Sequence, residues 1–241
     1  HNLMGAQFNL FRHEKLANTI RQFEQFVKQK HLAENENNRI LAYQYLYTAR
    51  INLYFLRGTF TKGLRLVPFL EDMLQQYSLY LDTHRVLVFY YKIASLYFGS
   101  GDNEKAIDYL NRIIHQKGDL RTDLQCYARL LHLIAHYELG NFDLLEYLIK
   151  SVYRYMAKME NLSKVEEEMF AFLRRSFKVG AAALKPEFEK LLAKLKKYEG
   201  NPLEARAFAY LDVISWLESK ISGVQVQDVI RQKFLLGKRG R

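Results

Sequence analysis

The sequence predicts an all-α protein, an α-solenoid of antiparallel helix hairpins, and three observations support this prediction. Apolar residues recur at intervals of three and four, the spacing of amphipathic helices rather than strands. Only three prolines interrupt the 241 residues, so long helices can form. Glycines recur at nearly constant intervals between these stripes, which predicts the turns of a repeating helical unit.

The stretch from Tyr90 to Gly118 shows one such hairpin most clearly. Two amphipathic stripes flank residues 99–103 (GSGDN), where glycine permits a turn and Asp or Asn can start the next helix. Ala94 and Ala106 are small residues on otherwise bulky stripes, which indicates that the two helices cross closely there. The stripes consist of Tyr90, Ile93, Ala94 and Tyr97 on one side, and of Ala106, Leu110 and Ile113 on the other.

This pattern resembles the tetratricopeptide repeat, in the form Tyr90-x2-Ile93-Ala94-x2-Tyr97 followed by Ala106-x3-Leu110. The family's usual period is about 34 residues. Here the spacings are 43, 39 and 40 residues between the turn glycines Gly58, Gly101, Gly140 and Gly180. The chain is therefore similar to a long-helix variant of the family with a period near 40 residues. The resemblance implies a right-handed superhelix of hairpins.

Taken in order, residues 1–241 are expected to form a single α-solenoid domain. Residues 8–32 should form one helix, compatible with the second half of a repeat that begins upstream. Pro68 should kink or break the second helix of the first hairpin. Residues 203–236 should form capping helices over the last hydrophobic face, and 237–241 a basic tail. The hairpins are expected at 38–77, 83–118, 120–157 and 163–199.

No catalytic constellation stands out, so the sequence predicts a non-enzymatic protein with no catalytic residues, no metal and no cofactor. His132 and His136 lie four residues apart on one predicted helix, a spacing that can bind zinc, but no third ligand accompanies them. Cys126 is the single cysteine, and a buried structural thiol is the simpler interpretation. No run of 18 uncharged apolar residues and no signal peptide are visible, so we expect no membrane span and a cytoplasmic location.

Positive charge gathers in the last third of the chain. The net charge is +10 and the isoelectric point is about 9.5. Residues 168–198 hold eight lysines or arginines against three glutamates, and residues 222–241 hold five against one aspartate. Solvated helix faces and a charged tail explain this most simply. The alternative is a nucleic-acid-associated regulatory protein that uses the basic C-terminal face.

The resemblance also implies where a partner would bind. In the family, the first helix of each hairpin lines a concave groove that grips an extended peptide or a partner helix. By register, the groove positions are Tyr45, Thr48, Asn52 and Phe55 in the first hairpin, Val88, Tyr91, Lys92, Ser95 and Phe98 in the second, Tyr127, Leu130, Ile134 and Tyr137 in the third, and Phe170, Arg174 and Phe177 in the fourth.

From these positions the sequence predicts a non-catalytic protein–protein interaction module. Asn52, Lys92 and Arg174 are polar donors, one in each of three hairpins, which favours an acidic or carboxylate-bearing protein or peptide partner. Tyr91, Phe98 and Tyr137 are expected to be exposed aromatics that lie off the packing stripe. The partner-binding residues that we predict are Asn52, Phe55, Tyr91, Lys92, Ser95, Phe98, Tyr137 and Arg174.

Overall fold

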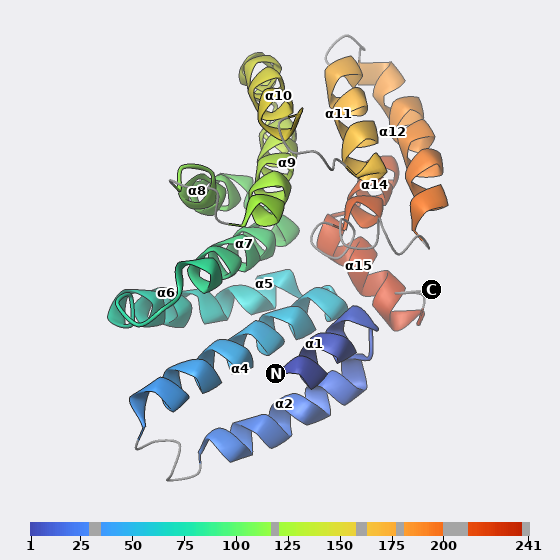
Figure 1. Cartoon of the computed structure of the whole chain (residues 1–241). Coiled ribbons are helices and arrows are strands. Elements are labelled where there is room, and N and C mark those ends of the chain that lie inside the picture. The colour runs from blue at the N-terminus through green and yellow to red at the C-terminus, as the bar shows by residue number, and fades with distance from the viewer. Residues whose placement is uncertain (29–34, 117–120, 158–162, 177–180, 200–211, 238–241) are drawn as a thin grey trace.

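The computed structural model describes residues 1–28, 35–116, 121–157, 163–176, 181–199 and 212–237, and within these ranges the chain forms helices and no strands (Figure 1). The all-α prediction is confirmed. The helices are α1 (Asn2–Asn9), α2 (His13–Val27), α4 (Glu36–Arg57), α5 (Phe60–Gly63), η1 (Leu64–Leu66), α6 (Val67–Gln76), α7 (Thr83–Ser100), α8 (Asn103–Ile114), α9 (Thr122–Glu138), α10 (Phe142–Ala157), α11 (Lys164–Ser176), α12 (Ala181–Leu195), η2 (Lys196–Tyr198), α14 (Val213–Ser222) and α15 (Val226–Leu235).

Consecutive helices pack side by side along the chain: α7 on α8, α8 on α9, α9 on α10, and α11 on α12. Three of the four predicted turn glycines, Gly58, Gly101 and Gly140, have positive φ at the helix ends, whereas Gly180 lies outside the described residues. Asp102 caps the helix after Gly101, because its carboxylate accepts the backbone N–H of Lys105 at 3.0 Å. The hairpin turns thus follow from local residue chemistry.

The predicted break at Pro68 is also confirmed. The second arm of the first hairpin is divided into α5, the 3₁₀ turn η1 and α6, and Pro68 lies in the first turn of α6. Proline fits there because its missing N–H would have no helical acceptor at that position.

The single helix that we expected at residues 8–32 is wrong within the described part of that range. Residues 2–27 form two helices, α1 and α2, which meet at a sharp corner where Phe11 adopts φ 53°. The corner turns α1 back onto α4, so that Met4 and Phe8 can pack with Leu16 of α2. A local stripe does not reveal this reversal, because both helices present apolar residues to the same cluster.

The C-terminal helices return to the first half of the molecule. α14 packs against α12, while α15 contacts both α4 and α7 (Figure 1). Arg231 of α15 donates to the backbone oxygen of Arg57 at 3.3 Å, and Thr61 donates through its hydroxyl to Gln227 at 2.9 Å. The beginning of the predicted cap, residues 203–211, lies outside the described residues. α15 therefore connects the two ends of the fold, which a cap on the last hairpin alone would not do.

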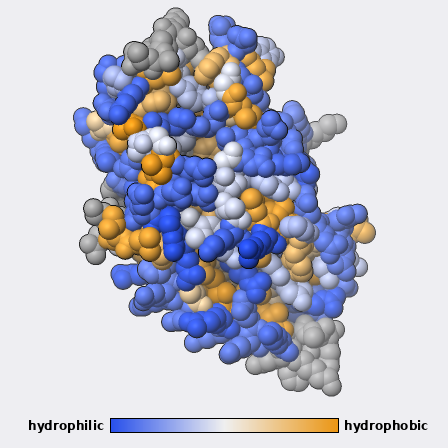
Figure 2. All heavy atoms as spheres, turned by 180° about the vertical axis from the view of Figure 1, so that it is seen from behind, coloured by the Kyte–Doolittle hydropathy of each residue, from blue (hydrophilic) through white to orange (hydrophobic). Residues whose placement is uncertain are grey.

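The apolar side chains divide between two clusters. A small cluster joins α1, α2 and one side of α4, and a large one runs from the other side of α4 to Ile230 of α15. The face in Figure 2 is mostly hydrophilic, with separate hydrophobic patches. None of the helices that the structure describes is long and apolar enough to cross a bilayer.

Candidate functional site

The candidate site lies between α4 and α7, which run side by side with a constant offset. Arg85 of α7 donates to the hydroxyl of Tyr45 of α4 at 3.4 Å, and Lys92 of α7 donates to Asn52 Oδ1 of α4 at 2.5 Å. Each pair is 40 residues apart in sequence. Because the offset stays the same while both residue numbers increase, the two helices are parallel, and corresponding positions of successive units face one another.

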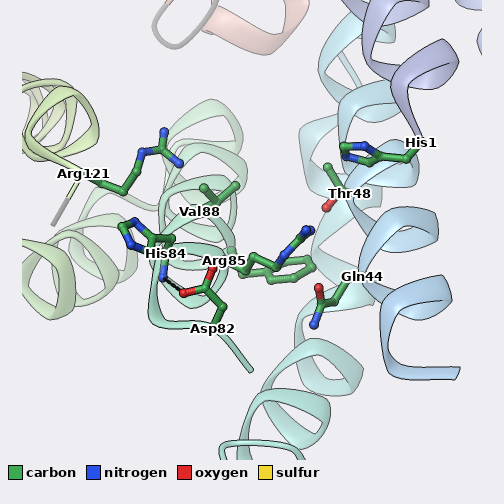
Figure 3. A pocket seen from close by; sticks show the side chains of 9 residues that line it. His1, Gln44, Thr48, Asp82, His84, Arg85, Val88 and Arg121 are labelled. Carbon is green, nitrogen blue, oxygen red and sulfur yellow. Dashed lines mark hydrogen bonds between the residues drawn. The ribbon is translucent and has the colours of Figure 1, made fainter. Parts of the chain in front are cut away.

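A hollow of about 310 Å³ opens along this seam (Figure 3). Thr48 and Val88, two of the groove positions expected by register, lie on its wall. Arg85 extends from α7 toward α4 across the hollow. The residues that line it are His1, Gln44, Thr48, Asp82, His84, Arg85, Val88, Phe89 and Arg121.

The charged groups of the hollow differ in how they are neutralised. Arg121 makes a two-point contact with Asp123, at 2.9 and 3.0 Å. Asp82 is exposed and caps α7 by accepting the backbone N–H of His84 at 3.1 Å. Arg85 is half-buried, and its guanidinium lies 5.2 Å from the centre of the Tyr45 ring. Arg85 has no carboxylate partner among the residues that the structure describes.

Gln44 contributes an unusual buried acceptor. Its side chain is 3% exposed, and its Oε1 lacks a hydrogen-bond partner among the described residues. A buried amide oxygen without a donor is unfavourable by about 1–3 kcal/mol. Since Gln44 is part of the lining, a ligand N–H or a water in the hollow could donate to this oxygen.

Lys92 lies one helical turn beyond Val88 and extends the same seam. Its side chain is half-buried, with the ammonium 5.5 Å from the ring centre of Phe55 and 5.8 Å from that of Phe8. Burial lowers the pKa of Lys92 to about 8, because the surrounding protein replaces the water that would stabilise the charge. Asn52, which accepts its hydrogen bond, is 6% exposed.

The structure brings together some of the predicted partner-binding residues. Asn52, Phe55 and Lys92 meet at the seam, and Ser95 lies one turn further along α7, where its hydroxyl donates to the backbone oxygen of Tyr91 at 2.8 Å. These four residues line one stretch, as the register predicted. Their role in partner binding stays a prediction.

The expectation that three aromatic residues are exposed is wrong. Tyr91, Phe98 and Tyr137 are all buried. Tyr137 packs edge-on against Phe188 and Trp216, at 6.2 and 6.3 Å between ring centres, because α12 and α14 cover this side of α9. The sequence could not show this, because the covering helices lie far along the chain.

Arg174 is exposed on α11, in a different part of the molecule from α4 and α7 (Figure 1). It therefore does not share the hollow with Lys92.

Sequence reasoning missed Gln44, Arg85 and Arg121. Arg85 could have been found, because it precedes Lys92 by seven residues and so lies on the same face of α7.

Several cations in the described part of the basic C-terminal third contact carboxylates. Lys196 and Lys233 both contact Glu218, at 3.2 and 2.6 Å. Lys194 contacts Glu168 at 2.8 Å. Similar pairs join Lys220 to Glu138 and Lys190 to Glu187. These side chains are thus engaged in contacts within the fold, and no arrangement of them gives the nucleic-acid alternative specific support in the described part of the chain.

The histidine pair on α9 is packed rather than arranged around a metal. The rings of His132 and His136 lie 4.5 Å apart, and His136 Nδ1 is 3.1 Å from the amide of Asn141. Burial and the neighbouring His136 lower the pKa of His132 to about 3. In the described ranges, no group of three His, Cys, Asp or Glu side chains has a geometry suited to a metal ion.

Comparison with known proteins adds no identity. No family model, no curated protein and no solved structure matches this chain significantly. Function must therefore be inferred from the geometry of the chain itself.

Proposed function

We propose that this chain is a non-catalytic protein-interaction module that binds a peptide or a partner helix along the seam between α4 and α7. The observation that carries this proposal is the hollow on that seam, at positions where the register of successive units expects a groove. Val88 and Phe89 give the hollow an apolar wall, and the rest of its lining is polar or charged, which suits a peptide segment with charged side chains.

The 40-residue offset between α4 and α7 supports the wider architecture. A second pair repeats nearly the same relation in the other helices of the hairpins: Glu71 of α6 accepts from the hydroxyl of Tyr109 of α8, 38 residues away. First helices thus lie beside first helices and second helices beside second helices. We therefore also propose that the chain forms an α-solenoid of tetratricopeptide-like hairpins, wound into a right-handed superhelix. A cytoplasmic location stays a prediction.

The proposal can be tested by filling the hollow. Peptides selected from a displayed random library would be measured for binding to the wild-type chain and to Val88→Trp, which places a large ring inside the hollow. Binding should weaken at least about tenfold, because the ring excludes the ligand from the volume it occupies. The matched control is Ser151→Trp, which adds the same ring at an exposed position of α10 and should change nothing.

Circular dichroism would confirm that both variants stay folded. If peptides bind V88W as tightly as the wild type, or if S151W weakens binding equally, the hollow is not the binding site.

A further inference from the structure

Among the residues that the structure describes, two cations on the α4-facing side of α7 have no acidic partner. Arg85 contacts the Tyr45 hydroxyl and ring, and Lys92 contacts Asn52 and two aromatic rings. Neither approaches a carboxylate among the described residues. They are seven residues apart, so the helical rise separates them by about 10 Å along one face of α7.

Several other partly buried cations in the same fold are better compensated. Arg129 donates to the backbone oxygens of Gln125 and Ile114 and to the side-chain oxygen of Gln125, and others have a carboxylate. Examples are Arg50 with Glu24 at 2.7 Å, Arg121 with Asp123 at 2.9 Å, Lys220 with Glu138 at 2.9 Å and Lys233 with Glu218 at 2.6 Å. Placing a cation away from water is unfavourable unless an anion or several acceptors compensate for the lost hydration. The seam therefore holds two positions where an incoming carboxylate would supply the missing charge.

The remaining polar groups favour a peptide over a simple anion. Gln44 Oε1 needs a donor, which a peptide N–H supplies and an inorganic anion does not. Asp82 at the hollow would repel a dense polyanion such as nucleic acid, but it tolerates a chain with spaced carboxylates. Apolar wall from Val88 and Phe89 offers contact to the aliphatic part of a side chain.

We infer that the seam recognises an acidic peptide segment whose two carboxylates bind Arg85 and Lys92, while a peptide N–H donates to Gln44. This inference rests on the proposed function and specifies its ligand. In a polyproline II conformation, residues i and i+3 lie on one side of the chain and about 9 Å apart, which matches the spacing of the two cations. The expected ligand pattern is therefore Glu-x-x-Glu.

The probes are fluorescein-labelled peptides of one length in a Pro/Ser background. The first carries Glu at i and i+3, the second carries Gln at both positions, and the third carries two adjacent Glu residues. Fluorescence anisotropy at physiological salt would measure their affinities. The Glu-x-x-Glu peptide should bind about tenfold more tightly than the other two, because only its carboxylates reach both cations.

Two variants locate the contacts. Arg85→Gln and Lys92→Met should each reduce the affinity for the Glu-x-x-Glu peptide by about five- to tenfold and leave that for the Gln peptide unchanged. K92M should not lower stability toward urea, because an apolar chain of similar length replaces a desolvated ammonium. Arg154→Gln, at an exposed position of α10, is the charge-matched control and should have no effect.

The outcomes separate the inference from the proposed function. If the Glu and Gln peptides bind alike and V88W abolishes both, the seam binds peptides without reading charge, and the inference is wrong. If inorganic phosphate displaces the Glu-x-x-Glu peptide at concentrations where chloride does not, the site selects a small anion, which also overturns it. The inference is wrong if none of the three labelled peptides binds, or if V88W leaves their affinity unchanged. The proposed function is wrong as well if V88W also leaves the affinity of the library-selected peptides unchanged, or if no peptide is selected.

Discussion

Lys92 and His132 show two ways in which this fold accommodates a basic side chain away from water. Lys92, with a pKa of about 8, remains charged at neutral pH and is held by Asn52 and two ring faces. His132, with a pKa near 3, is neutral and packs as an aromatic ring against His136. The partly exposed lysine can still meet a ligand, whereas the histidine, which is 7% exposed, can only affect stability.

The depressed pKa of His132 predicts a loss of stability in mild acid. Unfolded histidine titrates near 6.5, whereas the folded His132 titrates near 3. Between these values the unfolded chain binds a proton that the folded chain does not. The contribution is therefore fully present above pH 6.5 and is lost as the pH falls toward 3, by at most about 1.4 kcal/mol for each pH unit.

Urea denaturation from pH 7 to pH 4.5 would measure this dependence. His132→Gln should flatten it, while His1→Gln, at the exposed first residue, should leave it nearly unchanged. Equal pH dependence in the wild type and H132Q would show that His132 is not responsible.

At the scale of helices, the α7–α8 hairpin offers the most direct test of packing. Ala94 and Ala106 are fully buried where the two helices pack. Ala106→Leu should lower the free energy of unfolding by about 1–3 kcal/mol, because the added atoms must displace well-packed neighbours. Ala157→Leu at the exposed end of α10 is the matched control and should change stability by less than about 0.5 kcal/mol. Equal urea midpoints for the two variants would contradict the observed register.

The same hairpin shows how far the sequence could predict the fold. Its turn at Gly101, the cap at Asp102 and the two small residues depend on neighbours within one unit, and all three were predicted. The corner at Phe11 and the burial of Tyr137 depend on contacts with helices elsewhere in the chain. Local periodicity carries no information about those contacts.

The candidate site, too, could be predicted from the sequence only in part. Asn52 and Lys92 were predicted because both occupy one register position of successive units. The hollow itself was not predicted, since it also needs Arg121 from the segment before α9 and Gln44 of α4, whose Oε1 has no partner among the described residues. Whether a polar residue finds a partner is a property of the assembled helices rather than of its own helix.

For the whole molecule, α15 is the element that connects the two ends. It reaches the turn between α4 and α5, where Arg231 binds the backbone of Arg57, 174 residues away, and Phe234 lies 4.7 Å from the ring of His13. Such a contact couples the stability of the N-terminal hairpins to that of the C-terminal helices. An open array of repeats would instead share stability only between neighbours.

Gly58 is the residue at which this closure can be tested. It adopts φ +60°, and a Cβ there would collide with the backbone of Arg231. Gly58→Ala should therefore lower the free energy of unfolding by about 1–2 kcal/mol, because alanine is strained in the left-handed conformation, and it should also displace α15. Gly101→Ala is the matched control, since Gly101 also has positive φ but open space around its missing Cβ. Urea denaturation should show a larger loss of stability for G58A than for G101A. Amide hydrogen exchange at Val229 and Ile230 should accelerate in G58A alone. Equal losses and unchanged exchange at α15 would mean that the ends are not joined at Gly58.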